Sequence, residues 1–358
     1  MLLIGAAVGS ISSFIVFLAP SYSILLVAWM IIGIGTIVII PVGFSMLADY
    51  ASPWKRGKAF SILPIALALG SGGGIILANA FGETAWRPPF LVISIIGMII
   101  VMLSLLFFHE PERGGSEPEL RKLIQEGRTY GHRINIQKIK NTLGIRTNRW
   151  LAFSKILWRI PLGIYAYKFI PFLEMYGLSP GSKTIVTLFV GSGAVFGYLL
   201  GGVIGDWANK IRTGRILVSV LSLGSGIIFL FLALLIPRPE VLWSFNAFIV
   251  LLFALLGVVL VFINIPNVDA IVGDVNVPET RGMFISILNS IGWLGVGTGI
   301  LLSGIKAEAT WVSYKGILLW GTMVWLLTII SWLPLFGTIK KDAGRLREIM
   351  AQRAKEIT

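Results

Sequence analysis

The chain has 358 residues, of which 56% are hydrophobic and only 13% are charged. Charged residues make up about a quarter of an average soluble domain, so this composition excludes a soluble globular protein and predicts an all-α polytopic membrane protein. The chain has no cysteine and only two histidines. We therefore expect no disulfide framework, no metal site and no cofactor.

Charge-free runs of about 20 residues predict helices that cross the membrane. The first 48 residues carry no charge, and Pro20-Ser21-Tyr22 divides them into two runs. The ten predicted spans are Met1–Ala19, Ser23–Ala48, Ala59–Phe81, Phe90–Phe108, Trp150–Leu173, Thr184–Ile204, Ile216–Ile236, Leu242–Val268, Phe284–Ile305 and Gly316–Phe336.

Most of the 30 Lys and Arg residues fall in loops that share one side of this arrangement, or in the tail 337–358. The excess of positive charge on cytoplasmic loops therefore predicts that both ends are cytoplasmic, in a multi-pass protein of the plasma membrane. The net charge of +13 is a topology signal and does not indicate nucleic acid as a partner. Membrane lipid is the expected partner of the basic side. We expect a monomer.

One segment of the chain occurs twice. Without gaps, Arg281–Gly304 aligns with Arg56–Asn79 at nearly half of its positions, including the opening Arg-Gly and three alternating glycines. Spans one to four then correspond in order to spans seven to ten. Two helices of a symmetric pattern are missing before Met1, which predicts a truncated chain with ten of twelve spans. A native ten-helix protein is the alternative.

The repeat predicts four regions. These are an N-terminal half at 1–108, a linker at 109–149, a six-helix half at 150–336 and a basic cytoplasmic tail at 337–358. In the linker, Ile139 and Leu143 alternate with Lys138 and Arg146, as in a helix lying on the membrane surface. A solvated linker is the alternative.

Three motifs occur in the same order as in one known family. They are Gly201-Gly202-Val203-Ile204-Gly205-Asp206 followed by Lys210, Arg212, Gly214 and Arg215; the segment Leu26–Pro41; and the two Arg-Gly pairs, Arg56-Gly57 and Arg281-Gly282. The first resembles the loop motif between the second and third helices of a half in the major facilitator superfamily. The others resemble the fourth helix of that family and the starts of its fifth and eleventh helices. A looser likeness to spinster-type carriers lies in Arg56–Gly74 and 110–114.

The resemblance implies a two-half helical bundle and a secondary active transporter. Such a protein moves a small organic solute, anionic or amphiphilic, by alternating access and is coupled to a proton or a sodium ion. It is not an enzyme. The glycine-proline signature of antiporters is absent from Gly70–Ala80, and Trp29 stands where the fourth helix often has an arginine. Proton-driven drug antiport is therefore not predicted. A transport-inactive receptor or scaffold on the same fold is the alternative.

Buried charge is costly in a membrane, so Arg159 is the first candidate for substrate binding. It lies about 14 Å along its span, near the midplane, where transporter sites lie. We expect it to hold an anionic group; an ion pair that only joins helices is the alternative. No acidic residue is expected at its depth, because Asp269 follows the end of its span. Asn264 and Asn289 are further cavity-lining candidates, with helix-to-helix hydrogen bonding as the alternative.

A second set of residues predicts a cytoplasmic gate. The set consists of Gly202, Asp206, Arg212 and Arg215 from the loop motif, with Arg56 and Arg281 from the two repeat copies. Pseudo-symmetry places Asp206 at the start of the third span, where Arg56 and the positive end of a helix dipole favour a carboxylate. Such a contact exists only while the cytoplasmic side is closed. A simple helix cap is the alternative.

Overall fold

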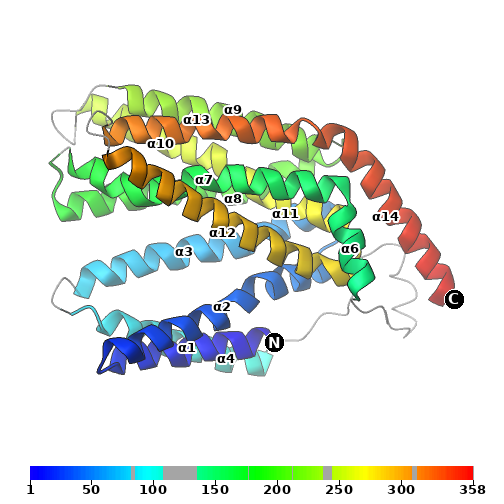
Figure 1. Cartoon of the computed structure of the whole chain (residues 1–358), viewed down its shortest axis with the longest axis horizontal. Helices are drawn as coiled ribbons and strands as arrows, with labels where there is room; N and C mark the ends of the chain where they lie inside the picture. Colours follow the sequence, from blue (N-terminus) through cyan, green and yellow to red (C-terminus); the bar gives the residue numbers. More distant parts are fainter. Residues whose placement is uncertain are drawn as a thin grey trace.

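The computed structural model describes residues 1–81, 85–107, 135–175, 177–211, 213–236, 244–308 and 313–357. Within these ranges the secondary structure is helical and includes no strand. The long helices run roughly side by side, with the short helix α6 and the sloping helix α14 at one end of the molecule (Figure 1). The predicted all-α class is confirmed.

We call the four helices of the first half of the chain the first unit: α1, α2 and α4 lie side by side, while α3 packs mainly on α8 of the second half (Figure 1). Its helices are α1 (Leu2–Leu18), α2 (Tyr22–Tyr50), α3 (Arg56–Phe81) and α4 (Pro88–Phe107). The first two helices separate at Pro20, as the sequence predicts. Ser21 caps α2, since its hydroxyl accepts a hydrogen bond from the Ile24 amide.

We call the helices of the second half the second unit: α7 packs on α12 and α13, while α10 packs on α8 and α9. Its helices are α7 (Arg146–Glu174), α8 (Pro180–Ala208), α9 (Gly214–Leu235), α10 (Phe245–Phe262), α11 (Asn264–Val275), α12 (Pro278–Glu308) and α13 (Tyr314–Trp332). Each of the ten predicted spans corresponds to a helix or, for the eighth, to the pair α10 and α11.

Eight helical segments in the described ranges are long and apolar enough to cross a membrane. The two other predicted spans are α1, which is apolar but has only 17 residues, and α7, which carries Lys155, Arg159 and Lys168. The chain is an integral multi-pass membrane protein, and the total of ten spans stays a prediction.

The eighth predicted span ends too early at Val268. Pro266 has no amide hydrogen to donate back to Phe262, so the helix is interrupted at Ile263 between α10 and α11. The chain then continues as α11 as far as Val275. This extension places Asp269 inside a helix instead of in the loop where the sequence analysis put it.

The two copies of the glycine pattern have different surroundings. A methyl group on Gly295 would lie 2.6 Å from the Ile156 carbonyl oxygen, and one on Gly299 would overlap the Ile160 carbonyl oxygen. These glycines therefore let α12 approach α7 closely. In the first copy, Gly74 has open space at the same position, so the close approach is made at Gly299 and not at its repeat counterpart.

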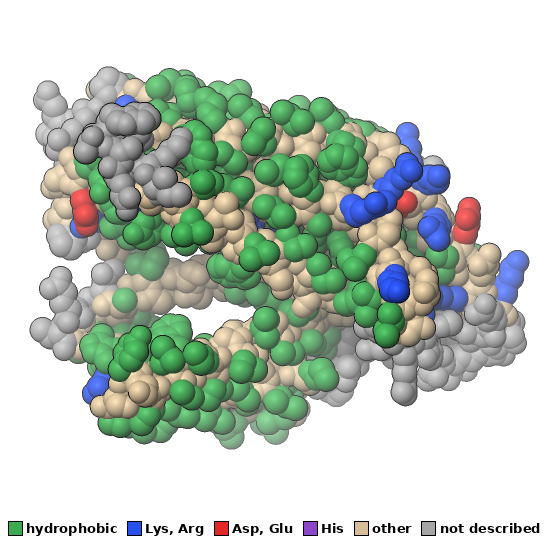
Figure 2. Space-filling model, viewed as in Figure 1, with side chains coloured by type: hydrophobic (Ala, Val, Ile, Leu, Met, Phe, Trp, Pro, Cys, Tyr) green, Lys and Arg blue, Asp and Glu red, His purple; other side chains and the backbone are tan. Residues whose placement is uncertain are grey.

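The two units close against each other at the end of the bundle that bears α6 and α14. Phe44, Ala48 and Phe60 of the first unit pack there into one buried apolar cluster with residues of the second unit, among them Ile271 and Phe284. At the opposite end, the space-filling view shows a hollow between the part formed by α1, α2 and α4 and the rest of the molecule (Figure 2).

Two amphipathic helices cover the closed end. Of the predicted linker, residues 109–134 lie outside the described ranges, and α6 (Ile136–Gly144) follows them, with Asn135 as its cap. Residues 337–357 of the predicted tail form all of α14 (Leu335–Ile357) except its first two residues. Lys and Arg side chains gather at this end of the molecule (Figure 2).

Candidate functional site

Asp206 lies at the start of α3, across the boundary between the two units. Its Oδ1 accepts a hydrogen bond from the Gly57 amide and its Oδ2 accepts one from the Lys58 amide, both at 2.9 Å. These amides belong to the first turn of a helix, where they have no partner within the helix and where the dipole favours an anion.

Glycine is required on both sides of this contact. A Cβ on Gly57 would lie 2.6 Å from Asp206 Oδ1 and 2.8 Å from the Gly202 carbonyl oxygen. Conversely, a Cβ on Gly202 would lie 2.7 Å from the Gly57 carbonyl oxygen. The two helices therefore meet backbone to backbone, which explains the spacing of Gly202 and Asp206 on one face of α8.

A row of four charges extends from Asp206 along the same boundary. Arg215 Nη2 lies 2.9 Å from Asp206 Oδ1, and its Nη1 lies 3.5 Å from Asp274 Oδ2. Arg56 Nη1 lies 3.2 Å from Asp274 Oδ1 and also donates to the Gly273 carbonyl oxygen. Both arginines are almost completely buried, with 1% and 2% exposed.

The partner of Arg56 in this row differs from the one predicted from the sequence. Asp206 pairs with Arg215 and with backbone amides, while the partner of Arg56 is Asp274, which the sequence analysis did not select. The sequence does contain a signal that could have pointed to Asp274, because the offset of the repeat aligns it with another aspartate, Asp49. Arg212 lies outside the described residues.

Arg281, the repeat counterpart of Arg56, is buried at the start of α12. Its Nε donates to the Asn276 carbonyl oxygen at 3.0 Å. Asn276 in turn exchanges side-chain hydrogen bonds with Asn148 at 2.7 and 3.0 Å. This arrangement fixes the connection between α11 and α12 onto α7.

A second group of charges lies deeper in the second unit, on α7 and α11. Lys155 Nζ lies 3.9 Å from Asp269 Oδ1, and both side chains are about 95% buried. Arg159 is one turn further along α7 and interacts electrostatically with Asp269. The expectation that no acidic residue shares the depth of Arg159 is therefore wrong. The continuation of the helix beyond Pro266 is the physical reason.

Arg159 packs between α7 and α12. Its guanidinium carbon lies 5.7 Å from the ring centre of Trp158 and 5.8 Å from that of Trp293, distances at which a cation is attracted to an aromatic face. Gly292 and Gly295 leave room for its stem, since a Cβ on either would lie within 3.3 Å of it. Its buried Nε has no hydrogen-bond partner among the described residues.

The two asparagine candidates do not join this group. Asn264 is 3% exposed at the start of α11, and its buried Nδ2 has no hydrogen-bond partner. Asn289 is half-buried on α12. Neighbouring Asn267 donates to the Gly201 and Ile263 carbonyl oxygens, which is the helix-to-helix bonding weighed as the alternative.

An apolar cavity of about 490 Å³ opens inside the second unit, between α7, α8, α9, α10 and α13. Aromatic side chains form much of its wall, namely Tyr165, Phe169, Phe172, Phe262 and Trp325. None of the three predicted binding residues lines it. This cavity could not be predicted from the sequence, because apolar runs do not reveal which faces of five helices leave a space between them.

Hydrogen bonds and ring contacts connect the cavity to Arg159. The Trp325 Nε1 donates to the Trp158 carbonyl oxygen at 3.0 Å, and its ring stacks on Tyr165 at 5.8 Å. Phe262 meets the Trp158 ring edge to face at 5.5 Å. Two side chains of the cavity wall, Trp325 and Phe262, thus contact Trp158, the residue directly before Arg159.

This fold and this boundary define a class: an integral membrane protein made of two helical units with a charged closure at one end. Residues 1–300 match the family model described as Major Facilitator Superfamily, and the chain belongs to that family. The family is one of transporters and not of enzymes. In the described residues, no group of three His, Cys, Asp or Glu side chains could hold a metal ion.

Several curated proteins are similar to parts of the chain. Multidrug resistance protein B homolog of Mycobacterium tuberculosis is 29% identical over 109 residues, which are 30% of this chain and 20% of that protein. Efflux pump radE of Floropilus chiversii is 26% identical over 201 residues, 49% of this chain and 37% of its own length. Multidrug resistance protein 1 of Bacillus subtilis is 26% identical over 121 residues, 34% of this chain and 31% of its length. The matched region is thus well under two thirds of each relative.

Among solved structures, the human organic anion transporter MFSD10 superposes with a TM-score of 0.61. The match covers 92% of this chain and 76% of that one, at 16% sequence identity. At this identity the likeness concerns the fold alone.

Proposed function

We propose that the protein is a secondary active transporter that moves an organic anion with an apolar part across the membrane by alternating access. The solute's charged group pairs with Arg159, and its apolar part occupies the aromatic cavity of the second unit. Transporter sites near the middle of the membrane combine ionisable groups with apolar walls in this way.

The charge balance around Arg159 carries the proposal. Lys155 and Arg159 supply two positive charges beside the one carboxylate of Asp269, and Lys155 is the cation nearest that carboxylate. Among the residues that the structure describes, one positive charge of this group is therefore left over, which is costly in a medium of low dielectric. A second anion, supplied by the solute, neutralises it.

The cavity supports an apolar part for the solute. Its volume of about 490 Å³ falls in the range of small-molecule pockets, and its wall is almost wholly apolar. The similar proteins named as multidrug resistance proteins and as an efflux pump support transport of a small molecule.

The row from Arg56 to Asp206 supports alternating access. It joins groups of both units at the closed end, so the units have to part there before a solute can leave on that side. In this proposal Gly202, Asp206, Arg215 and Arg56 form the gate, and Arg281 anchors the start of α12 beside it.

Transport assays in proteoliposomes test the solute class. Three naphthalene dyes of similar size, carrying a sulfonate, no charge or a quaternary ammonium group, are compared with imposed proton and sodium gradients in separate runs. We expect accumulation of the sulfonate dye above the other two. Arg159→Ala abolishes it, Arg159→Lys retains part of it, and Lys183→Ala serves as control, because Lys183 pairs with an exposed glutamate at 2.9 Å at the other end of α7.

Equal movement of the three dyes contradicts the role of Arg159. Absence of movement for every dye, under both gradients and in exchange, favours the alternative of a transport-inactive receptor or scaffold. Dependence on only one of the two gradients identifies the coupling ion.

A further inference from the structure

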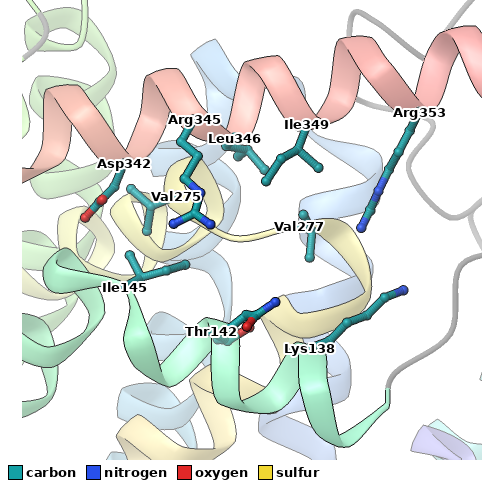
Figure 3. Close-up of a pocket in the computed structure, with 11 residues that line it drawn as sticks. Lys138, Thr142, Ile145, Val275, Val277, Asp342, Arg345, Leu346, Ile349 and Arg353 are labelled. Atoms are coloured by element: carbon teal, nitrogen blue, oxygen red, sulfur yellow. The ribbon is translucent and has the colours of Figure 1, made fainter.

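A small pocket lies at the closed end of the molecule, away from the boundary between the units. It is enclosed by α6, by the connection from α11 to α12 and by α14, and its volume is about 110 Å³ (Figure 3). The distribution of Lys and Arg predicts that this end faces the cytoplasm. The pocket shares no residue with the aromatic cavity or with the gate.

Three cations line this pocket. They are Lys138 of α6 and Arg345 and Arg353 of α14. Glu279, whose side chain is 0% exposed, pairs with two of them: its Oε1 lies 2.8 Å from Lys138 Nζ and 3.1 Å from Arg353 Nη2. One buried carboxylate thus holds two of the three cations in place.

The other carboxylate of the pocket is directed to the backbone. Asp342 Oδ2 accepts hydrogen bonds from the Thr147 amide at 2.9 Å and from the Thr147 hydroxyl at 2.7 Å. Arg345 extends from α14 toward α6, into the space between the two helices (Figure 3). Among the described residues, no ion pair or hydrogen bond joins Arg345 to a protein group.

We propose that this pocket binds a phosphate monoester group, with Arg345 as its principal contact and Lys138 and Arg353 at its edge. A guanidinium presents parallel N–H donors that match the oxygens of phosphate. Since about 10–15 Å³ of this kind of volume holds one water molecule, the pocket has room for a group of phosphate size but not for a whole solute.

The phosphate has two possible carriers. One is the headgroup of an anionic lipid, because α6 and α14 are amphipathic and basic side chains gather at this end of the molecule (Figure 2). The other is a small soluble phosphate ester. Both present the same group to the same residues, so the experiment separates them by where the phosphate is supplied.

The test uses the full chain reconstituted in lipid nanodiscs. In one arm, phosphatidylcholine discs receive glycerol 3-phosphate in solution at constant ionic strength. In the other arm, a series of discs contains increasing fractions of phosphatidic acid and no soluble phosphate. Saturable binding is measured by the shift in thermal unfolding and by native mass spectrometry. Binding in the first arm identifies a soluble ester, and binding in the second alone identifies a lipid headgroup.

Two matched variants decide whether the measured binding occurs in this pocket. Arg345→Ala should weaken Kd by about tenfold or more in the arm that binds, since a charge-assisted hydrogen bond is lost. Arg347→Ala removes the same charge from an exposed position of α14 outside the pocket and should change Kd by less than about twofold. Equal weakening by the two variants, or no saturable binding in either arm, overturns the proposal. Both arginines are exposed, so both variants are expected to fold.

Discussion

Arg56 and Asp274 join the two helical units through an ion pair of 3.2 Å between Nη1 and Oδ1. Arg56 is at the start of α3 in the first unit, and Asp274 is at the end of α11 in the second. Arg215 lies between this carboxylate and that of Asp206, so the two aspartates face two nearly buried arginines.

Asp274→Ala should therefore destabilise the protein more than an ordinary surface change does. Removing one partner of a buried ion pair costs about 3–5 kcal/mol, because the remaining charge stays buried. Thermal unfolding in detergent measures the loss. Glu174→Ala is the control: its ion pair with Lys183 is exposed, and such pairs contribute about 0–1 kcal/mol. A loss no larger than that of the control would show that the buried row adds nothing to stability.

Asp206→Asn should open the closed end of the bundle. The substitution removes the charge that interacts with the start of α3 and with Arg215. Hydrogen bonds to a charged group contribute about 1.5–3 kcal/mol, so the ratio of open to closed molecules should rise by about tenfold or more. The chain has no cysteine, so Ala48→Cys gives a single reporter thiol in the buried cluster between the units.

Labelling of that thiol by a water-soluble maleimide is the measurement. Asp342→Asn provides the control, because Asp342 also accepts a hydrogen bond from a backbone amide at 2.9 Å but within one unit. If the labelling rate is the same in both variants and in the parent, Asp206 is a simple helix cap.

The sequence could predict the parts of the structure that depend on local pattern and on the repeat. Pro20 separates two helices because it cannot continue the first, and Asp206 reaches the start of α3 because the two units repeat one architecture. Both inferences need only residue types and spacing.

The deep charge group could not be predicted in the same way. The rule that a span stops at its first charge predicts an end at Val268 for the span that contains Asn264. Helix α11 instead continues past this point and buries Asp269 beside Lys155. Whether a charge ends a helix or is buried with a partner depends on what the neighbouring helix presents. The aromatic cavity depends likewise on the mutual rotation of five helices.

The pair Lys155 and Asp269 should behave as a unit in stability measurements. Lys155→Met leaves Asp269 buried, but Arg159 remains as a second cation, so the loss should stay below the about 3–5 kcal/mol expected for a fully orphaned charge. Asp269→Asn should cost more, since it leaves two cations and no anion. The double variant should recover most of the loss of Asp269→Asn, and a double-mutant cycle on unfolding free energies measures the coupling. Strict additivity of the two single changes would contradict the pairing.

The two copies of the glycine pattern provide the last prediction, in which each copy is the control for the other. Gly299 and Gly74 occupy equivalent positions of the repeat. A methyl group on Gly299 would overlap the Ile160 carbonyl oxygen, so α12 and α7 would have to separate, and overpacking of this kind costs about 1–3 kcal/mol. Nothing lies within 4 Å of the same methyl group on Gly74, where alanine should instead gain up to about 1 kcal/mol of helix propensity. Gly299→Ala should thus lower the unfolding temperature in detergent, and Gly74→Ala should leave it unchanged or raise it. Equal effects of the two substitutions would mean that the close approach of α7 and α12 does not depend on glycine.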